Sequence, residues 1–328
     1  MLAQGARLIA GVFVCALIFL ASGCASLVPQ TTALRDAWLP PGLPARVELA
    51  AVPFFAQDDY QCGPAALAMV LSHAGVKVTP PDLVPQVYLP ARQGTLQVEM
   101  LAAARRNGLV SYQLAPTYPA LLRELAAGTP VVVLQNLGLF SGWHYAVAIG
   151  YDFEPGELFL RSGETERKVM NFGVQEFFWR RGGYWSMVAL PPGRIPATAE
   201  EERWLQAVIA FEKINPPAQN RTAYISFLQR WPENVTAAIG LANAHYALGE
   251  LSAAEGVLRE AARRDPSSVP VLNNLAQTLS DLGRNEEALS IIERAAAQGG
   301  RYAEEVGKTR ETILQRIGAA KGAGQAPR

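Results

Sequence analysis

The strongest constraint on the fold is a repeat in the last third of the sequence. Six positions of this region carry the same or a similar residue 34 positions later. They are Leu241, Ala242, Gly249, Ala254, Leu258 and Ala261, which correspond to Leu275, Ala276, Gly283, Ala288, Ile292 and Ala295. Small side chains at these positions let paired helices approach closely, and each glycine turns one helix into the next. The repeat therefore predicts an array of stacked helices, each burying its apolar face against its neighbours.

This pattern resembles the tetratricopeptide repeat, which has the same period. The first copy ends in Asp265-Pro266 as that family often does, whereas the second ends in Gly299-Gly300. A degenerate earlier copy is expected between Trp204 and Pro232. Two clear copies are few for an independent array, so we expect docking on the first domain of the chain or dimerisation to complete its core. The resemblance implies that residues 200–317 bind a protein partner.

The first 23 residues are typical of an export signal. Arg7 precedes an apolar run of 14 residues, 8–21, which is short for a helix spanning a bilayer about 30 Å thick. The run leads into Leu20-Ala-Ser-Gly-Cys24, which resembles a bacterial lipobox with its leucine one place further from the cysteine than usual. That resemblance implies a lipid on Cys24 and, since no Asp follows, an outer-membrane location facing the periplasm. An ordinary signal peptide or an uncleaved anchor remains the alternative.

The composition excludes several classes of function. Half of the 328 residues are hydrophobic, enough for two folded units, and 29 basic residues balance 29 acidic ones, so nothing indicates a nucleic-acid partner. No phosphate-binding glycine motif is present, and the three histidines and three cysteines lack metal-ligand spacing, so neither a metal nor another cofactor is expected. Cys15 leaves with the signal and Cys24 carries lipid, which makes Cys62 the only free thiol and excludes an internal disulfide.

Between signal and repeats the sequence predicts a tether and an α+β domain. Residues 24–50 are polar and then Pro-rich, so they are expected to hold little helix or strand. Residues 51–192 show helical patterns at 65–74, 96–107 and 119–127, followed by strand patterns at 130–137, 144–150, 157–160 and 184–190. At the other end of the chain, the Gly- and Ala-rich tail 318–328 is predicted to be disordered.

The stretch DYQCGPAAL places Cys62 just ahead of a predicted helix. Unpaired N–H groups and the helix dipole at that position favour a thiolate, which predicts a lowered thiol pKa. Gly63 would let a substrate approach, and the amide of Gln57 could donate a hydrogen bond to a developing oxyanion. The alternative is a buried helix-start cysteine beside an ordinary loop glutamine.

A thiol nucleophile needs a base, and three histidines are available. His73 lies on the same predicted helix, roughly 16 Å along its axis from Cys62, which is too far. His245 falls in the repeats, where packing is the simpler role. His144 opens a predicted strand and could stand at the sheet edge facing the helix start, although a structural role remains the alternative.

The segments QDDYQCGPAALAMVL, GTPVVVLQNLG and WHYAVAIGYD together resemble the bacteriocin-processing cysteine peptidases that cut double-glycine leaders. They resemble more closely the stand-alone peptidase-like lipoproteins that join such a domain to tetratricopeptide repeats. Over residues 51–190 the resemblance implies a papain-like fold, in which a helix bearing the cysteine packs on an antiparallel sheet bearing the histidine. It implies that Cys62 is the nucleophile, His144 the general base and Gln57 the oxyanion-hole donor.

One position departs from that family. Its members usually carry Asp or Asn at the end of the strand after the histidine strand, where it orients the imidazole. Here the matching place is Arg161-Ser162, so Ser162 is the candidate for this role, without the charge of a carboxylate. Asp152 is the nearest acidic alternative, but it is expected in a turn. The third member of the triad therefore stays open.

These features favour a lipid-anchored envelope cysteine peptidase that hydrolyses peptide bonds and uses its repeats to bind a protein partner or substrate. Two alternatives remain. The first is a catalytically weak domain that binds peptides, and the second is a scaffold in which the repeats carry the main function.

Overall fold

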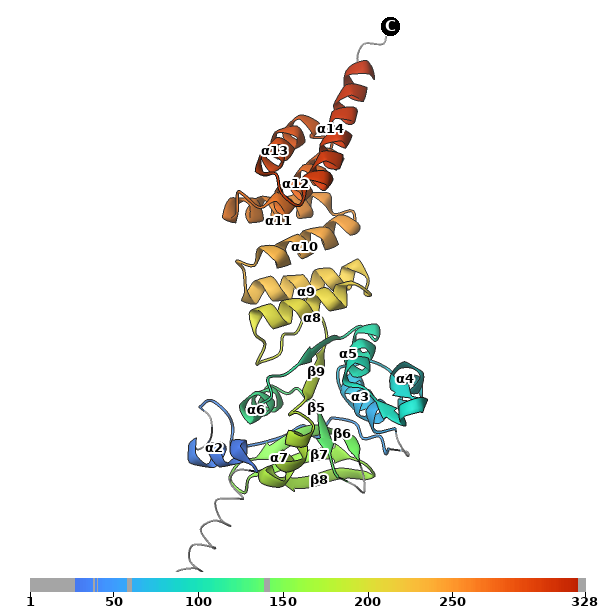
Figure 1. Cartoon of the computed structure of the whole chain (residues 1–328), viewed down its shortest axis with the longest axis vertical. Helices are drawn as coiled ribbons and strands as arrows, with labels where there is room; N and C mark the ends of the chain where they lie inside the picture. The colour runs from blue at the N-terminus through green and yellow to red at the C-terminus, as the bar shows by residue number, and fades with distance from the viewer. Residues whose placement is uncertain (1–26, 38, 40, 58–60, 139–141, 324–328) are drawn as a thin grey trace, which may run out of the picture. The chain divides into compact units, whose positions relative to one another are not determined.

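The computed structural model describes residues 27–37, 39, 41–57, 61–138 and 142–323. The expected signal and lipobox, including Cys24, lie outside these residues. The chain divides into two compact units (Figure 1). The first comprises the residues up to Leu190 together with 196–199, and the second comprises 191–195 and everything from Glu200 onward. No helix in the described ranges is long and apolar enough to cross a membrane.

The first unit combines helices with a sheet. Its helices are α2 (Pro29–Ala37), α3 (Cys62–His73), α4 (Pro80–Val87), α5 (Gln97–Arg106), α6 (Tyr118–Ala126) and α7 (Phe172–Arg181), with a 3-10 turn η1 (Pro90–Arg92). Its strands are β1 (Arg46–Glu48), β2 (Tyr88–Leu89), β3 (Gly94–Thr95), β4 (Val110–Gln113), β5 (Val131–Asn136), β6 (Trp143–Asp152), β7 (Glu157–Ser162), β8 (Thr165–Asn171) and β9 (Ser186–Leu190).

The sheet that carries the histidine is antiparallel throughout. Its strands run in the order β4-β9-β5-β6-β7-β8, and β1 pairs with the far end of β6, beyond the end of β5. Strands β2 and β3 form a separate two-stranded ribbon. The predicted α+β fold, with a cysteine-bearing helix on an antiparallel sheet, is confirmed.

Helix α3 is stabilised by apolar side chains buried along its length, and its N-cap residue makes no side-chain hydrogen bond to the helix. Every residue from Gly63 to Leu71 is buried, and those from Ala65 onward belong to one core cluster with Val147 and Ile149 of β6. Burying a Leu or Met side chain contributes about 1.5–3 kcal/mol, so this cluster fixes α3 firmly to the sheet. The first residue of the helix is Cys62 itself, with Gln61 as its N-cap.

The tether is more structured than the sequence predicted. Helix α2 and strand β1 both fall within residues 24–50, where little helix or strand was expected. The carboxylate of Glu176 on α7 accepts the N–H groups of Gln30 at 2.9 Å and Thr31 at 2.6 Å. N–H groups in the first turn of a helix have no acceptor within the helix. Here a buried carboxylate that is distant in sequence provides the acceptor.

The second unit is entirely helical in the residues described. It consists of α8 (Glu201–Glu212), α9 (Pro217–Arg230), α10 (Val235–Ala247), α11 (Leu251–Arg264), α12 (Val269–Asp281), α13 (Asn285–Gln298) and α14 (Ala303–Ala323). Gly249 and Gly283 turn one helix into the next at φ of 75° and 81°, as the repeat predicted. Helix α14 continues to Ala323, so the prediction of disorder from residue 318 is wrong for 318–323.

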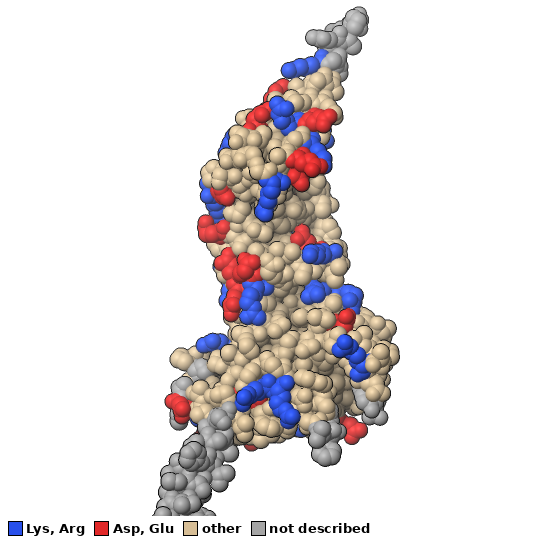
Figure 2. Space-filling view, viewed as in Figure 1, with Lys and Arg blue, Asp and Glu red and all other residues tan. Residues whose placement is uncertain are grey.

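The helices of this unit follow one another in antiparallel pairs (Figure 1), and a single apolar cluster runs through α10 to α14. Basic and acidic side chains are interspersed on its visible face (Figure 2). An ion-pair network on its surface joins α11 to α13 through Glu255, Arg259, Arg284 and Glu287. These charged side chains thus form ion pairs between helices of the same unit.

Candidate active site

Cys62 lies half-buried at the first position of α3, against the core cluster. Burial raises the pKa of its thiol, and the backbone N–H groups of Tyr145, Gly63 and Cys62 itself offset only part of this effect. The prediction of a lowered thiol pKa is therefore wrong, because the loss of hydration outweighs the helix start. The role of the backbone of Tyr145 shows that the sulfur lies beside β6, next to the residue that follows His144.

Gly63 serves packing rather than access. A methyl group at this position would lie 2.6 Å from the Cβ of Thr95, on the β2–β3 ribbon. The space that was expected to admit a substrate is thus occupied by the Thr95 side chain. Thr95 also accepts, through its carbonyl oxygen, a hydrogen bond of 3.2 Å from the Tyr145 hydroxyl. The ribbon therefore fastens the start of α3 to the strand that carries the histidine.

His144 is held by the neighbouring strand. Its Nε2 lies 2.9 Å from Oγ of Ser162, the last residue of β7. The pairing of β6 with β7 sets this contact, since Val147 opposes Arg161. Ser162 thus stands at the position from which the sequence predicted the imidazole would be oriented.

Burial is also the main influence on the imidazole. Burial, together with a smaller effect of the nearby charge of Lys168 on β8, lowers the pKa of His144 to about 4. Both effects disfavour an imidazolium ion. With a thiol whose pKa is raised and an imidazole whose pKa is lowered, the two groups rest uncharged near neutral pH.

Gln57 reaches the same place from the loop before α3. Its Nε2 donates to the carbonyl oxygen of Tyr145 at 3.4 Å, and its backbone N–H donates to that of Gly163 at 3.3 Å. The Gln57 amide and the Cys62 thiol thus both lie beside the backbone of Tyr145. The structure thus pairs His144 with Ser162, and it places Cys62 and Gln57 beside Tyr145, the residue that follows His144 on β6.

The other candidates lie elsewhere. His73, at the far end of α3, faces the carbonyl oxygen of Gly128 at 3.4 Å. His245 pairs with Glu250 at 2.6 Å within the helical unit. Asp152 ends β6, where it pairs with Arg46 at 3.3 Å. In the described part of the chain, no group of three His, Cys, Asp or Glu residues could hold a metal ion.

Sequence reasoning missed Arg161. The residue is only 6% exposed, and its guanidinium donates to the carbonyl oxygens of Val52 at 3.0 Å and Glu166 at 2.5 Å. It therefore ties the strand that ends in Ser162 to the loop that leads to Gln57. The only local signal was an arginine inside an apolar strand, and that signal did not reveal its partners.

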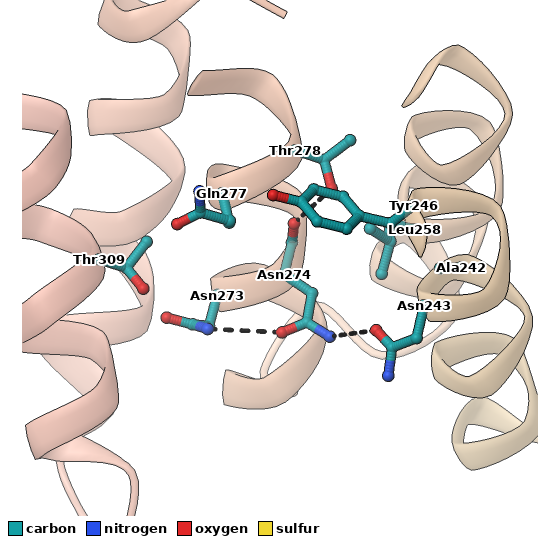
Figure 3. Close-up of a pocket in the computed structure, with 9 residues that line it drawn as sticks. All are labelled: Ala242, Asn243, Tyr246, Leu258, Asn273, Asn274, Gln277, Thr278 and Thr309. Atoms are coloured by element: carbon teal, nitrogen blue, oxygen red, sulfur yellow. Dashed lines mark hydrogen bonds between the residues drawn. The ribbon is translucent and has the colours of Figure 1, made fainter. Parts of the chain in front are cut away.

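The helical unit has a pocket of its own, of about 270 Å³ (Figure 3). Its lining residues are all uncharged: Ala242, Asn243, Tyr246, Leu258, Asn273, Asn274, Gln277, Thr278 and Thr309. Asn273 donates to Asn274 at 3.4 Å, and Asn274 donates to Asn243 at 3.1 Å. At one end of this row of hydrogen-bonded carboxamides, Oδ1 of Asn273 is buried with no hydrogen-bond partner. The pocket thus offers carboxamides rather than charges.

Comparison with known proteins agrees with these two halves. Residues 49–163 match the Peptidase_C39 like family, and residues 205–269 and 271–297 match tetratricopeptide repeats. The first repeat match includes the degenerate copy expected between Trp204 and Pro232. No curated protein matches the chain.

Three solved structures illustrate the similarity. A C39-like peptidase from Bacillus anthracis is 18% identical, with 44% of this chain and 97% of that chain covered and a TM-score of 0.38. A double glycine motif protease from an AMS/PCAT transporter, in complex with the leader peptide, is 19% identical over 43% of this chain and 91% of that chain, with a TM-score of 0.33.

The third is the tetratricopeptide domain of Sgt2 from Aspergillus fumigatus, 20% identical over 40% of this chain and 87% of that chain, with a TM-score of 0.36. The peptidase-like match lies within the first folded unit, and both repeat matches lie within the second. The chain therefore consists of a C39-peptidase-like domain of α+β fold followed by a region of tetratricopeptide repeats.

Proposed function

We propose that the first unit is a cysteine peptidase in which Cys62 attacks a peptide carbonyl and His144 acts as general base. The observation that carries this proposal is the 2.9 Å contact between Nε2 of His144 and Oγ of Ser162. With its proton on Nε2, the ring donates to Ser162 and keeps the lone pair of Nδ1 for the thiol proton.

The reaction begins from uncharged groups. Nδ1 of His144 takes the proton of Cys62 as the sulfur bonds to the carbonyl carbon, and the carbonyl oxygen becomes an oxyanion. The Gln57 amide and the Cys62 N–H, in the first turn of α3, donate hydrogen bonds to that oxyanion. The imidazolium then protonates the leaving amine, and water attacks the thioester with His144 again as base, which releases the acid and restores the thiol.

Helix α3 and the ribbon keep this geometry in place. Because Gly63 is covered by Thr95, substrate is expected to approach the sulfur from the side of Gln57 rather than across the helix start. Preorganised donors contribute most when they do not have to move during the reaction. The core around α3 supplies that rigidity.

We further propose that the repeats present a peptide-binding pocket, and that Cys24 carries a lipid anchoring the protein in the bacterial envelope. A peptide group offers one donor and one acceptor, as does the carboxamide chain from Asn273 to Asn243. The ligand that we propose for this pocket is therefore the main chain of a protein partner or substrate. For the lipid, the support is the lipobox resemblance around Cys24.

A second candidate function is peptide binding with weak catalysis. Two observations favour it: Ser162 supplies no charge to stabilise an imidazolium, and the pKa values of Cys62 and His144 are shifted against ion formation. Each shift raises the barrier to the first proton transfer.

Alkylation by a peptidyl chloromethyl ketone, followed by intact-protein mass spectrometry, tests the dyad. His144→Ala is expected to slow the modification of Cys62 at least 100-fold, the lower range of general-base catalysis. His73→Ala, on the same helix as Cys62, is the matched control and is expected to leave the rate unchanged. Equal rates in wild type and His144→Ala would refute the dyad and leave the peptide-binding candidate.

A further inference from the structure

Helix α7 turns an apolar and basic face outward. Val174 and Phe177 are 51% and 38% exposed, although the helix buries Phe172 and Trp179 on its other side. Arg181, one turn beyond Phe177, lies over its ring at 5.5 Å. Exposed apolar side chains three residues apart, with arginine beside them, form one stripe along a helix.

The N-terminal end of the described chain continues this stripe. Helix α2 packs against α7 (Figure 1), and Cγ2 of Val28 would lie 3.9 Å from a methyl group at Gly173. Leu27 is 46% exposed, and its carbonyl oxygen accepts a hydrogen bond of 3.2 Å from Arg180. We call the surface formed by Leu27, Val174, Phe177 and Arg181 the α7 face.

We propose that the α7 face docks on the surface of an anionic lipid bilayer and sets the orientation of the peptidase-like domain. The reason for proposing a bilayer is the short length of chain between Leu27 and the segment expected to enter the membrane. Six Cα steps separate Leu27 from the end of the apolar run at Ala21, which is at most roughly 20 Å, and three steps separate it from Cys24, at most roughly 10 Å. Whichever of the two enters the membrane, the α7 face lies within reach of the headgroups. The inference rests on the membrane anchoring proposed above.

The charges of this region suit the same occupant. On α2 and α7 the exposed charged side chains are Arg35, Asp36, Arg180 and Arg181, an excess of basic groups. The one acidic residue of α7, Glu176, is fully buried and is used by α2 and Tyr184. Basic side chains near an anionic surface and apolar side chains at the headgroup boundary both favour binding.

Hydroxyl-radical footprinting of the full chain tests this directly. The protein is compared in nanodiscs containing about one quarter phosphatidylglycerol and in micelles of an uncharged detergent. Oxidation of Phe177 is expected to fall at least threefold in nanodiscs, while that of Ile214, an exposed side chain of the helical unit, stays unchanged. The variant Arg181→Gln is expected to recover part of the Phe177 oxidation. Arg301→Gln, which alters another arginine lying over an aromatic ring, is expected to recover none.

Each other outcome overturns the proposal in a distinguishable way. A chain that fails to enter nanodiscs refutes the anchoring itself. Incorporation without protection of Phe177 leaves the anchor and refutes the docking. Oxidation of Phe177 that is equally low in nanodiscs and micelles, relative to that of Ile214, shows that residues before Leu27, rather than the bilayer, cover the α7 face.

Discussion

At the scale of single residues, Ser162 decides how His144 can work. Its hydroxyl fixes the ring through Nε2 but brings no negative charge to the imidazolium that forms during attack. The charge that does stand nearby, Lys168, has the opposite effect. This site is therefore organised for orientation, and its electrostatic support comes from backbone donors around the sulfur.

Removing the hydroxyl measures the value of that orientation. Ser162→Ala is expected to lower the rate of Cys62 alkylation by the peptidyl reagent roughly 2- to 10-fold, since a neutral hydrogen bond contributes about 0.5–1.5 kcal/mol. Ser186→Ala is the matched control, because Ser186 is a buried serine of the same sheet whose hydroxyl has no partner. A Ser162→Ala rate equal to wild type would show that the hydroxyl does not orient the base.

Burial of His144 links stability to pH. Its pKa is about 4 in the folded protein against an ordinary 6.5, so the unfolded chain takes up the proton first as the pH falls. The free energy of unfolding is therefore expected to decrease between pH 6.5 and 4, by up to about 3 kcal/mol from this residue, and to level off below.

Chemical denaturation of wild type and His144→Gln at several pH values checks this. Other groups titrate alike in both proteins, so the difference between their unfolding free energies isolates the imidazole. A difference that stays constant from pH 7 to pH 4 would contradict the burial effect.

At the scale of elements, the contact between α3 and the β2–β3 ribbon holds the site together. Helix propensity alone predicts that Gly63→Ala stabilises α3, by up to about 1 kcal/mol. The structure predicts the opposite sign, a loss of about 1–3 kcal/mol, because the methyl group overlaps Thr95. Thermal unfolding decides between them. The double variant Gly63→Ala/Thr95→Gly is expected to recover part of the loss, and no recovery would mean that Thr95 is not the cause.

The elements also show what sequence can and cannot predict. Strands β5 and β6 are rich in β-branched or apolar residues and were expected, as were α3 and the helices of the repeats. Helix α2 was missed because its cap is Glu176, about 145 residues away, and β8 was missed because the charged stretch TERKVMN reads as a loop. The position of Ser162 opposite the histidine strand was anticipated from the family pattern. The covering of Gly63 by Thr95 and the effect of burial on both pKa values depend on packing, which local pattern does not reveal.

At the scale of the whole molecule, the two units have separate apolar cores. We therefore expect two transitions in calorimetry. Ile292→Ala, which empties a fully buried site in the helical unit, should lower one transition, with a cost of about 2–5 kcal/mol. The alkylation rate of Cys62 should stay at its wild-type value. A single transition that shifts as a whole would show that the units unfold as one.

The raised pKa of the Cys62 thiol has a consequence beyond the rate of the first step. Thiolates attack peroxide and disulfides, and exposed thiolates react fastest, so a protonated and partly buried sulfur is oxidised slowly. The burial that makes the Cys62 thiol harder to deprotonate thus also slows its oxidation. In the oxidising compartment proposed for this protein, such a cysteine is expected to be oxidised more slowly than an exposed thiol of ordinary pKa.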